Sequence, residues 1–449
     1  METKLAGIAR AAKLKPEERF TSLAHLINVE MIIMCHREMS SNKAAGVDEV
    51  TKKDYEANLT ENAKELIGRM KRQAYKPQPV RRVYIPKPGT NKTRPLGIPA
   101  YEDKLVQAAM TKILNAIYEQ DFVENSFGFR PNRGCHDALK VLNKIVNMKE
   151  IKYVVDADIK GFFEHVDHEW ILKFLQHRIA DPNIIRLIAR FLKSEIMEAG
   201  IRYDTPEGTP QGGPISPILG NIYLHYVLDL WFEKKIRKNS KGQAFMVRYA
   251  DDTIFCFEYE EDAAEFYPKM KDRLRAFNLE VAEEKTEIIK LGKDDNDKDD
   301  NNDAGGDAKT GTFDFLGFTH YVGTGIDGRK RIKRKTSRKK YNAGLHRCRE
   351  WIKKNRHMPT VDFMKKIKAK VQGHCNYYSV TDNVTYVNNF IHDVRKLIYK
   401  WLNRRSQRKS FCWGKFNLFL EKYPLPKARI RVNIFEPGIG YKYVLRMVK

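Results

Sequence analysis

Two adjacent aspartates, Asp251 and Asp252, stand between two apolar runs in residues 245–257 (FMVRYADDTIFCF). Both runs are rich in β-branched and aromatic residues, which predicts a strand, a tight turn and a second strand. The turn places the two carboxylates side by side. Ionised neighbours of this kind repel each other unless a cation neutralises them, and oxygen ligands suit hard divalent cations, magnesium above all. A polar turn without a metal is the alternative, because Asp is common in turns.

A second acidic segment strengthens the metal interpretation. Residues 152–163 (KYVVDADIKGFF) begin as a β-branched run and end in acids. Asp156 and Asp158 are two apart, so they share one face of a strand. If this strand lies beside the hairpin, three carboxylates converge on a pair of metal ions about 4 Å apart, as in two-metal phosphoryl transfer.

These segments also carry a family resemblance. The sequence YADD at residues 249–252 resembles the YxDD box of reverse transcriptases, and DIKGFF at residues 158–163 resembles the partner aspartate motif. Six motifs in all run in the family's order, in segments from residues 46–48 (GVD) to the C-terminal tail. Nearer still is the resemblance to bacterial group II intron-encoded reverse transcriptases, or maturases. The resemblance implies an RNA-directed DNA polymerase of α+β class with a right-hand architecture: fingers, a palm whose antiparallel sheet carries the YADD hairpin, and an α-helical thumb.

Charge and cysteine usage fit a nucleic-acid enzyme. The formal charge of the 449-residue chain is +25, with a pI near 9.6, so a polyanion is the expected partner, with nucleic acid first and a membrane surface as the alternative. We expect no membrane association, because no run of eighteen apolar residues occurs and the N-terminus lacks a signal-peptide core. Six scattered cysteines without a CxxC pair favour a reduced cytoplasm.

Composition divides the chain into three parts. Residues 1–80 are polar and helical in tendency, and we assign them to an N-terminal extension and the start of the fingers. Residues 81–325 become fingers and palm, with a hairpin-like fingertip at 81–99 and helical spacing at 104–118, 135–148 and 184–192. Residues 293–311, rich in Asp, Asn and Gly, are expected to be a disordered insertion. Residues 326–449 become a basic helical thumb, since residues 329–410 hold 25 Lys and Arg against 4 Asp and Glu.

The resemblance assigns the catalytic residues. Asp158, Asp251 and Asp252 become catalytic metal ligands, the main-chain carbonyl of Ile159 completes the shell, and Asp156 is an accessory acid or a strand-end residue. The expected cofactor is a pair of Mg²⁺ ions, with Mn²⁺ as an alternative. Lys285 corresponds to a lysine near the end of the palm sequence in the family, which donates a proton to the leaving pyrophosphate.

Four further residues are expected to bind the incoming nucleotide. Lys87 and Arg94 match the two basic fingertip residues of the family, with surface charge as the alternative. Phe163 matches the aromatic residue that excludes a ribose 2′-hydroxyl by steric clash, with a core phenylalanine as the alternative. Gln211, in the turn QGGP, lies near the incoming base in the family.

The expected nucleic-acid contacts lie later in the chain. Residues 315–318 (FLGF) resemble the primer-grip hairpin, although an ordinary buried strand fits equally well. The members of this predicted primer grip are Phe315, Leu316, Gly317 and Phe318. Basic residues expected to contact nucleic acid are Arg130, Arg334, Lys335, Arg338, Lys339 and Lys340.

The expected partners are an RNA template with a DNA or RNA primer, dNTPs and a structured intron RNA whose splicing the protein assists. Two alternatives stay open: a reverse transcriptase serving host defence or repair, and an RNA-binding splicing factor without polymerase activity. The chain resembles relatives that lack an endonuclease domain. Monomer and homodimer are both compatible with the sequence.

Overall fold

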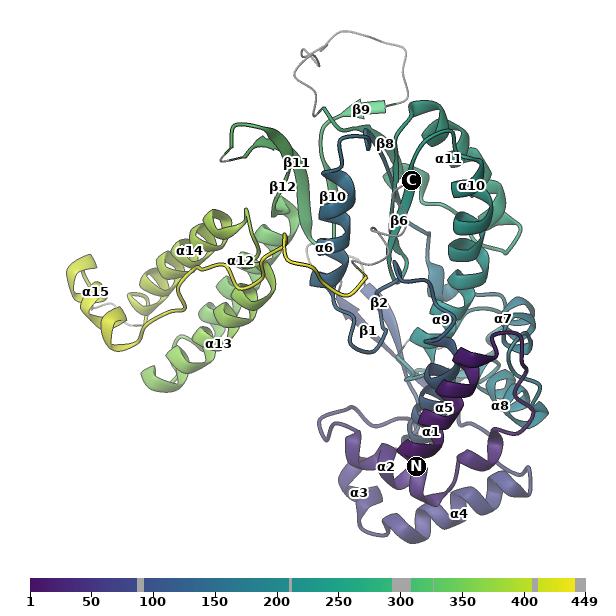
Figure 1. Cartoon of the computed structure of the whole chain (residues 1–449). Coiled ribbons are helices and arrows are strands. Elements are labelled where there is room, and N and C mark those ends of the chain that lie inside the picture. The colour runs from purple at the N-terminus through teal and green to yellow at the C-terminus, as the bar shows by residue number, and fades with distance from the viewer. Residues whose placement is uncertain (87–92, 210–211, 293–307, 326, 406–410, 441–449) are drawn as a thin grey trace.

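The computed structural model describes residues 1–86, 93–209, 212–292, 308–325, 327–405 and 411–440, with the backbone alone for Lys285 and for residues 308–310. Lys87, Gln211 and most of the predicted insertion therefore lie outside the described residues. The protein is of the α+β class, as predicted, with three sheets and a helical C-terminal part (Figure 1). Among the described segments, no helix has the length and apolar character needed to cross a membrane.

The N-terminal part is helical, as the sequence predicts. Thr51 and Asp54 form a reciprocal capping box that starts a short helix, with N–H to side-chain oxygen distances of 3.0 and 3.3 Å. The long helix α5 packs against α1 and α2 and is buried along most of its length. The helices are α1 (Glu2–Leu14), η1 (Ala24–Leu26), α2 (Val29–Glu38), α3 (Lys52–Glu56), α4 (Leu59–Lys71) and α5 (Tyr101–Tyr118).

The predicted fingertip hairpin is confirmed and belongs to a four-stranded sheet in the order β2-β1-β4-β5. Its strands are β1 (Val80–Pro86), β2 (Thr93–Ile98), β4 (Ile196–Glu198) and β5 (Ile201–Tyr203). Strands β1 and β2 are antiparallel, and Ile85 faces Arg94 across the ladder. The outer end of this sheet, residues 84–86 and 93–94, is exposed.

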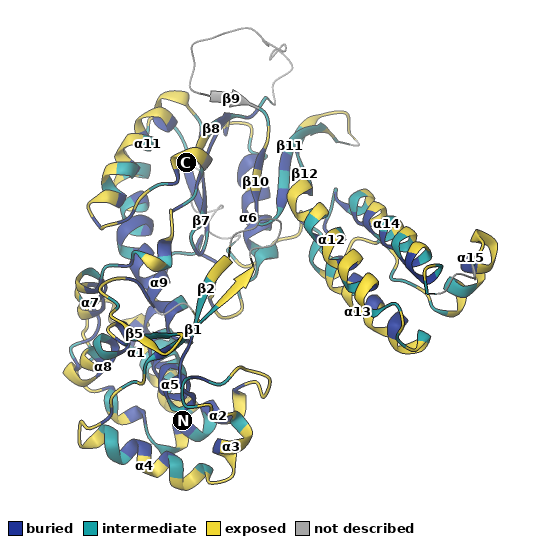
Figure 2. Ribbon diagram, turned by 180° about the vertical axis from the view of Figure 1, so that it is seen from behind, coloured by how far each residue is buried: buried dark blue, intermediate teal, exposed yellow. Residues whose placement is uncertain are grey.

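The central sheet has the order β6-β7-β3-β8-β9 and is covered on both faces. Side chains alternate along its strands: Val247 and Ile254 pack toward α6, whereas Met246 and Phe255 pack toward α11. Strands β6 and β7 are therefore almost wholly buried, which Figure 2 shows in dark blue. The strands are β3 (Tyr153–Ala157), β6 (Ala244–Tyr249), β7 (Asp252–Phe257), β8 (Glu287–Lys290) and β9 (Ala308–Thr310).

Helices around this sheet follow the predicted periodicities. The expected helices at 135–148 and 184–192 are α6 (Cys135–Val146) and α8 (Pro182–Leu192). Helix α9 (Ser216–Leu224) continues into two π-helical segments, η3 (His225–Asp229) and η4 (Phe232–Ile236). The remaining helices are η2 (Phe162–Glu164), α7 (His168–Gln176), α10 (Arg237–Asn239), α11 (Glu260–Arg275) and η5 (Glu283–Lys285).

The end of the predicted insertion is ordered, contrary to expectation. Residues 308–310 form β9, which pairs in parallel with β8. Backbone hydrogen bonding to an existing sheet edge stabilises this strand without any apolar side-chain pattern, which is why composition did not reveal it. The earlier residues of the insertion, 293–307, lie outside the described part.

A third sheet joins the central part to the C-terminal helices. It contains β10 (Phe313–Phe315), β11 (Phe318–Thr324) and β12 (Lys330–Thr336). The three helical patterns of the basic region are confirmed as α12 (Arg338–Asn355), α13 (Thr360–Tyr378) and α14 (Val384–Leu402), followed by α15 (Trp413–Lys422). These helices have their own core, in which Phe363, Ile367 and Phe390 are buried.

After α15 the chain returns to the central part, as the yellow trace of Figure 1 shows. Val432 bridges to Val380 at the end of α13, and Ile434 is buried in the same core as α6. This tail therefore connects the C-terminal helices to α6.

Candidate active site

Strand register brings the two acidic segments together. Strands β3 and β7 are antiparallel, and the ladder ends with Ala157 opposite Thr253. One step further along, Asp158 comes opposite Asp252, because both strands continue toward the hairpin turn. The turn closes with Tyr249 paired to Asp252, so Asp251 occupies the tip.

Burial and repulsion between neighbouring carboxylates make Asp156, Asp251 and Asp252 weaker acids than usual. Burial, followed by the charges of Asp251 and Asp158, raises the pKa of Asp252 to about 7. Burial, followed by the charges of Asp252 and Asp158, raises the pKa of Asp156 to about 8. The pKa of Asp251 is also raised, again mainly by burial, although Arg94 and Arg248 oppose the shift. The cluster therefore resists full ionisation unless positive charge is added.

The carboxylate oxygens of these aspartates are ligands that suit hard divalent cations, although the side chains do not surround a single metal position. No group of three or more His, Cys, Asp and Glu side chains is arranged around a single metal position in the described part of the chain. Ile159 could add an oxygen. It bridges to Val281 with the flanking hydrogen bonds made by Lys160 N–H and Asp158 C=O. In such a pair the carbonyl of Ile159 points away from the Val281 strand.

Arg94 and Phe163 are the predicted nucleotide-binding residues that the structure describes. Arg94 is exposed at the fingertip, and its charge reaches Asp251. The ring of Phe163 lies against α9, where a Cβ on Gly220 would meet it at 2.9 Å. The turn after Gln211 passes so close to the fingertip that a Cβ on Gly212 would lie 2.4 Å from the carbonyl oxygen of Gly97. The side chain of Lys285 is not described, and its backbone belongs to η5.

The predicted primer grip requires a correction. Phe315 and Phe318 are 1% and 0% exposed, so neither ring can contact a primer. They anchor β10 and β11, which are joined by the two-residue turn Leu316-Gly317. Both turn residues have positive φ, 50° and 81°, as a type I′ turn requires. This turn is the accessible part of the predicted grip.

The Leu316 turn connects the acids to the C-terminal helices. The backbone N–H of Leu316 donates to the carboxylate of Asp252. The hydroxyl of Tyr377, at the end of α13, donates to the Leu316 carbonyl at 2.8 Å. The ring of His136 on α6 in turn contacts the Tyr377 carbonyl oxygen at 2.8 Å. Two consecutive hydrogen bonds thus link α13 to a predicted metal ligand, which sequence reasoning missed because the partners lie 61 residues apart.

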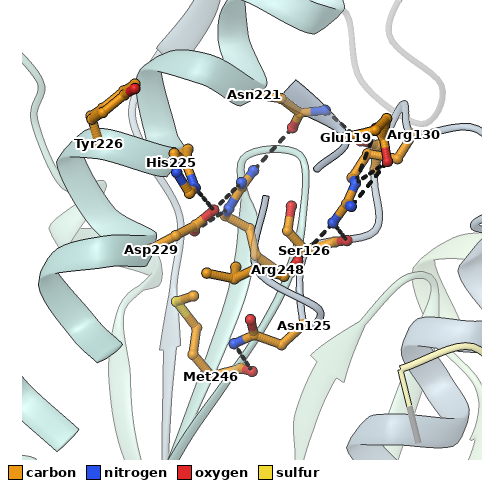
Figure 3. A network of polar contacts seen from close by, with 12 residues as sticks. Glu119, Asn125, Ser126, Arg130, Asn221, His225, Tyr226, Asp229, Met246 and Arg248 are labelled. Atoms are coloured by element: carbon orange, nitrogen blue, oxygen red, sulfur yellow. Dashed lines mark hydrogen bonds and ion pairs between the residues drawn. The ribbon is translucent and has the colours of Figure 1, made fainter. Parts of the chain in front are cut away.

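A buried ion pair stabilises the β6–β7 hairpin that carries Asp251 and Asp252 (Figure 3). The guanidinium of Arg248 donates to both carboxylate oxygens of Asp229, at 2.7 and 2.5 Å, and both side chains are fully buried. The same guanidinium donates to the carbonyl of Ala250 at 2.9 Å. Ala250 has a φ of 59°, which is unfavourable for a residue with a Cβ. Arg248 therefore holds a strained residue next to Asp251. The sequence feature that could have indicated this buried ion pair is a charged residue, Arg248, inside the apolar run FMVRY at residues 245–249.

Residues 127–131 (FGFRP) have a structural role that their sequence did not reveal. A Cβ on Gly128 would lie 2.3 Å from the backbone nitrogen of Ala250, so only glycine permits this packing against the catalytic turn. Asn221 of α9 donates to the Gly128 carbonyl at 2.7 Å and accepts from Arg248 at 3.1 Å. The loop, α9 and the hairpin are thus held together by one network, part of which Figure 3 displays.

Two predicted nucleic-acid contacts are wrong. The side chain of Arg130 is 1% exposed, forms an ion pair with Glu119 at 3.0 Å and donates to the carbonyls of Val123 and Ser126. Arg334 is 0% exposed and lies between Asp382, at 3.8 Å, and Asn143. Both arginines have partners inside the fold, and burial denies them access to a ligand.

The other predicted basic contacts remain accessible. Lys335 is half-buried over the ring of Tyr321, and Arg338, Lys339 and Lys340 are exposed in the first turn of α12. The charge of Lys340 lowers the pKa of Asp252, which places this lysine near the acids. The histidines after β3 are engaged in hydrogen bonds: the His168 ring contacts the Gly208 carbonyl oxygen at 2.7 Å, and His165 contacts Glu207.

Comparison with known proteins identifies the family. The reverse transcriptase (RNA-dependent DNA polymerase) family model matches residues 85–320, and the group II intron maturase-specific domain matches residues 341–419. The first match covers more than half of the chain, which therefore belongs to the reverse transcriptase family. Its fold is that of a right-hand polymerase with a helical thumb.

Curated relatives agree with this membership. The chain is 38% identical over 222 residues to the group II intron-encoded protein LtrA of Lactococcus lactis subsp. cremoris, covering 49% of this chain and 37% of that protein. It is 35% identical over 243 residues to Protein YkfC of Escherichia coli (strain K12), covering 52% of this chain and 64% of the relative. The matched part thus spans less than two thirds of each relative. Members of the family use divalent metal ions.

Proposed function

We propose that this protein is an RNA-directed DNA polymerase that copies an RNA template into cDNA from dNTPs. The observation that supports the proposal is the register of β3 and β7, whose ladder ends at Ala157 and Thr253, so that Asp158 and Asp252 follow on neighbouring strands near Asp251 in a half-buried acidic site. A protein that only binds RNA gains nothing from three neighbouring carboxylates that repel one another. We assign residues 81–325 to fingers and palm and residues 326–449 to the thumb.

The acids are proposed to hold two Mg²⁺ ions, with Mn²⁺ as an alternative. Asp158, Asp251 and Asp252 supply side-chain oxygens, and the carbonyl of Ile159 supplies a backbone oxygen. When bound, such ions activate the primer 3′-hydroxyl and neutralise the triphosphate. Arg248 and Gly128 hold the turn that carries Asp251, and the Leu316 N–H orients Asp252.

The remaining residues of the site bind and select the nucleotide and primer. Arg94, with Lys87, is proposed to contact the triphosphate, and Gln211 to lie near the incoming base. Phe163 is proposed to exclude a 2′-hydroxyl, since α9 supports the ring from behind. Lys285 is proposed to protonate the leaving pyrophosphate. The Leu316-Gly317 turn and Lys340 are proposed to contact the primer backbone.

A second role in splicing is proposed for the C-terminal helices. Helices α13 and α14, and α12 from Tyr341 onward, lie within the part that matches the maturase-specific domain, and their surfaces carry exposed Lys and Arg side chains. We infer that they bind a structured group II intron RNA and assist its splicing and mobility. A reverse transcriptase serving host defence or repair is the second candidate, because it would share the same polymerase site.

The polymerase proposal is tested by primer extension. Poly(rA) with an oligo(dT) primer, dTTP and Mg²⁺ should give labelled cDNA with the wild-type protein and only background with Asp251→Asn. Asp272→Asn makes the same chemical change on the exposed face of α11 and should retain the wild-type rate. Equal incorporation by the wild type and Asp251→Asn would refute the proposal.

A further inference from the structure

A basic groove lies away from the acidic site, between α6, the end of the β11–β12 hairpin and the C-terminal tail. It encloses about 630 Å³. The three walls come from distant parts of the sequence, and Figure 1 shows the tail crossing beside α6. Six cationic side chains line it: Lys140, Lys144, Lys149, Arg329, Lys330 and Arg331.

The cations that line the groove outnumber its acids. Its lining includes two acids, Asp327 and Glu436, against the six cations. Lys140, Lys144 and Lys149 form no ion pair with any residue in the described ranges, and Lys144 and Lys149 are exposed. Like charges gathered on one wall raise the local potential and favour an anionic ligand with several charges.

The groove is held in shape by hydrogen bonds beneath it. The side chain of Asn147 accepts from the Ile332 N–H at 2.8 Å and donates to the Ile332 carbonyl at 3.3 Å, which ties the end of α6 to β12. Arg331 forms a two-pronged pair with Asp382 at 2.6 and 3.0 Å. A ligand would therefore meet a preformed surface.

An aromatic side chain stands at the edge of the groove. Phe435 is 52% exposed, and the guanidinium of Arg331 lies 5.0 Å from its ring centroid. Exposed aromatic rings beside clustered cations are the combination that binds unpaired nucleotides, because bases stack on the ring while lysines contact phosphates. A duplex would keep its bases stacked inside and leave Phe435 unused.

The groove is separate from the polymerase site. Cys135, at the start of α6, hydrogen-bonds with Tyr249 beside the catalytic turn. Lys144 is nine residues later, about 13 Å further along the helix.

We propose that this groove binds a single-stranded segment of RNA, such as a loop of a structured RNA, independently of the template. The inference rests on the proposed function for the identity of the polyanion as RNA. The lysines of α6 contact successive phosphates, and an unstacked base lies on Phe435.

Fluorescence anisotropy with a short labelled single-stranded RNA tests the groove. The protein is first saturated with an unlabelled RNA–DNA primer–template, which occupies the polymerase site. The triple variant Lys140→Ala, Lys144→Ala, Lys149→Ala should bind the probe at least tenfold more weakly. Its plot of log affinity against log salt should flatten by about 2, since each phosphate contact on a single strand contributes about 0.7. Phe435→Ala should weaken binding at least fivefold with little change in the salt slope.

A matched control removes three exposed lysines from the other side of the palm. Lys234→Ala, Lys235→Ala, Lys238→Ala lies on η4 and α10, beside α11, and should change binding less than twofold. Equal binding by the two triple variants would overturn the proposal. An equal loss for duplex DNA of the same length would overturn the assignment to single-stranded RNA. Primer extension by the groove variant should match the wild type, whereas a wild type without cDNA synthesis would refute the polymerase function and leave the groove measurement valid.

Discussion

Removing the carboxylate of Asp229 is expected to weaken the palm sheet and the catalytic turn together. In Asp229→Asn the guanidinium of Arg248 stays buried at 0% exposure without a charged partner. Loss of one member of a buried ion pair costs about 3–5 kcal/mol, because the remaining charge keeps its desolvation penalty. This loss of stability should affect β6 and Ala250, whose carbonyl accepts a hydrogen bond from the same guanidinium at 2.9 Å.

Hydrogen exchange measures this effect where it arises. The free energy of opening for amides of β6 and β7, followed in increasing urea, should fall by about 3–5 kcal/mol in Asp229→Asn. Glu265→Gln makes the same change on the exposed face of α11, which packs on the same sheet, and should leave the exchange unchanged.

The double variant Asp229→Leu, Arg248→Met separates stability from activity. Replacing both partners by apolar residues should restore most of the stability, since no charge remains buried. cDNA synthesis should stay low, because the Ala250 carbonyl still lacks its donor. A decrease of less than about 1 kcal/mol in Asp229→Asn would refute the reasoning, since it would mean that the buried charge is compensated elsewhere.

Three more predictions concern selectivity, coupling and pH. Phe163→Ala should lower the preference for dTTP over UTP at least about tenfold in primer extension, because the ring supported by Gly220 no longer blocks a 2′-hydroxyl. Tyr377→Phe should lower kcat and raise the Mg²⁺ concentration for half-maximal rate severalfold, because Leu316 loses its anchor. Burial lowers the pKa of His225 to about 4; its contribution to stability, complete above about pH 6.5, should decline by up to about 3 kcal/mol as pH falls toward 4.

Each of these predictions has a control. Phe162→Leu alters the neighbouring buried ring and should keep sugar selectivity. Tyr341→Phe loses a comparable 2.7 Å bond to Asp393 within the thumb and should keep the wild-type Mg²⁺ dependence; identical curves for the two tyrosine variants would contradict the coupling. His225→Gln should flatten the difference in urea stability between pH 6.5 and 4 relative to the wild type, and an unchanged difference would count against the buried-histidine explanation.

Much of the fold and part of the site followed from local sequence. The apolar runs around Asp251 and Asp252 determine a strand, a tight turn and a strand, because side-chain alternation and turn chemistry act within a few residues. The same holds for α8, whose apolar residues recur on one helical face. The motif order then pointed to the three acids, and the register of β3 and β7 places them together.

Only the tertiary structure decided which charges and rings face a ligand. The sequence predicted that Arg334 and Arg130 contact nucleic acid. In the structure, Arg334 lies between Asn143 and Asp382. Arg130 forms an ion pair with Glu119. Burial of a charge depends on partners far away in the chain, so no local pattern reports it. The same is true of the groove beside α6, whose walls meet only because the tail returns from α15 and packs Ile434 into the core of the palm.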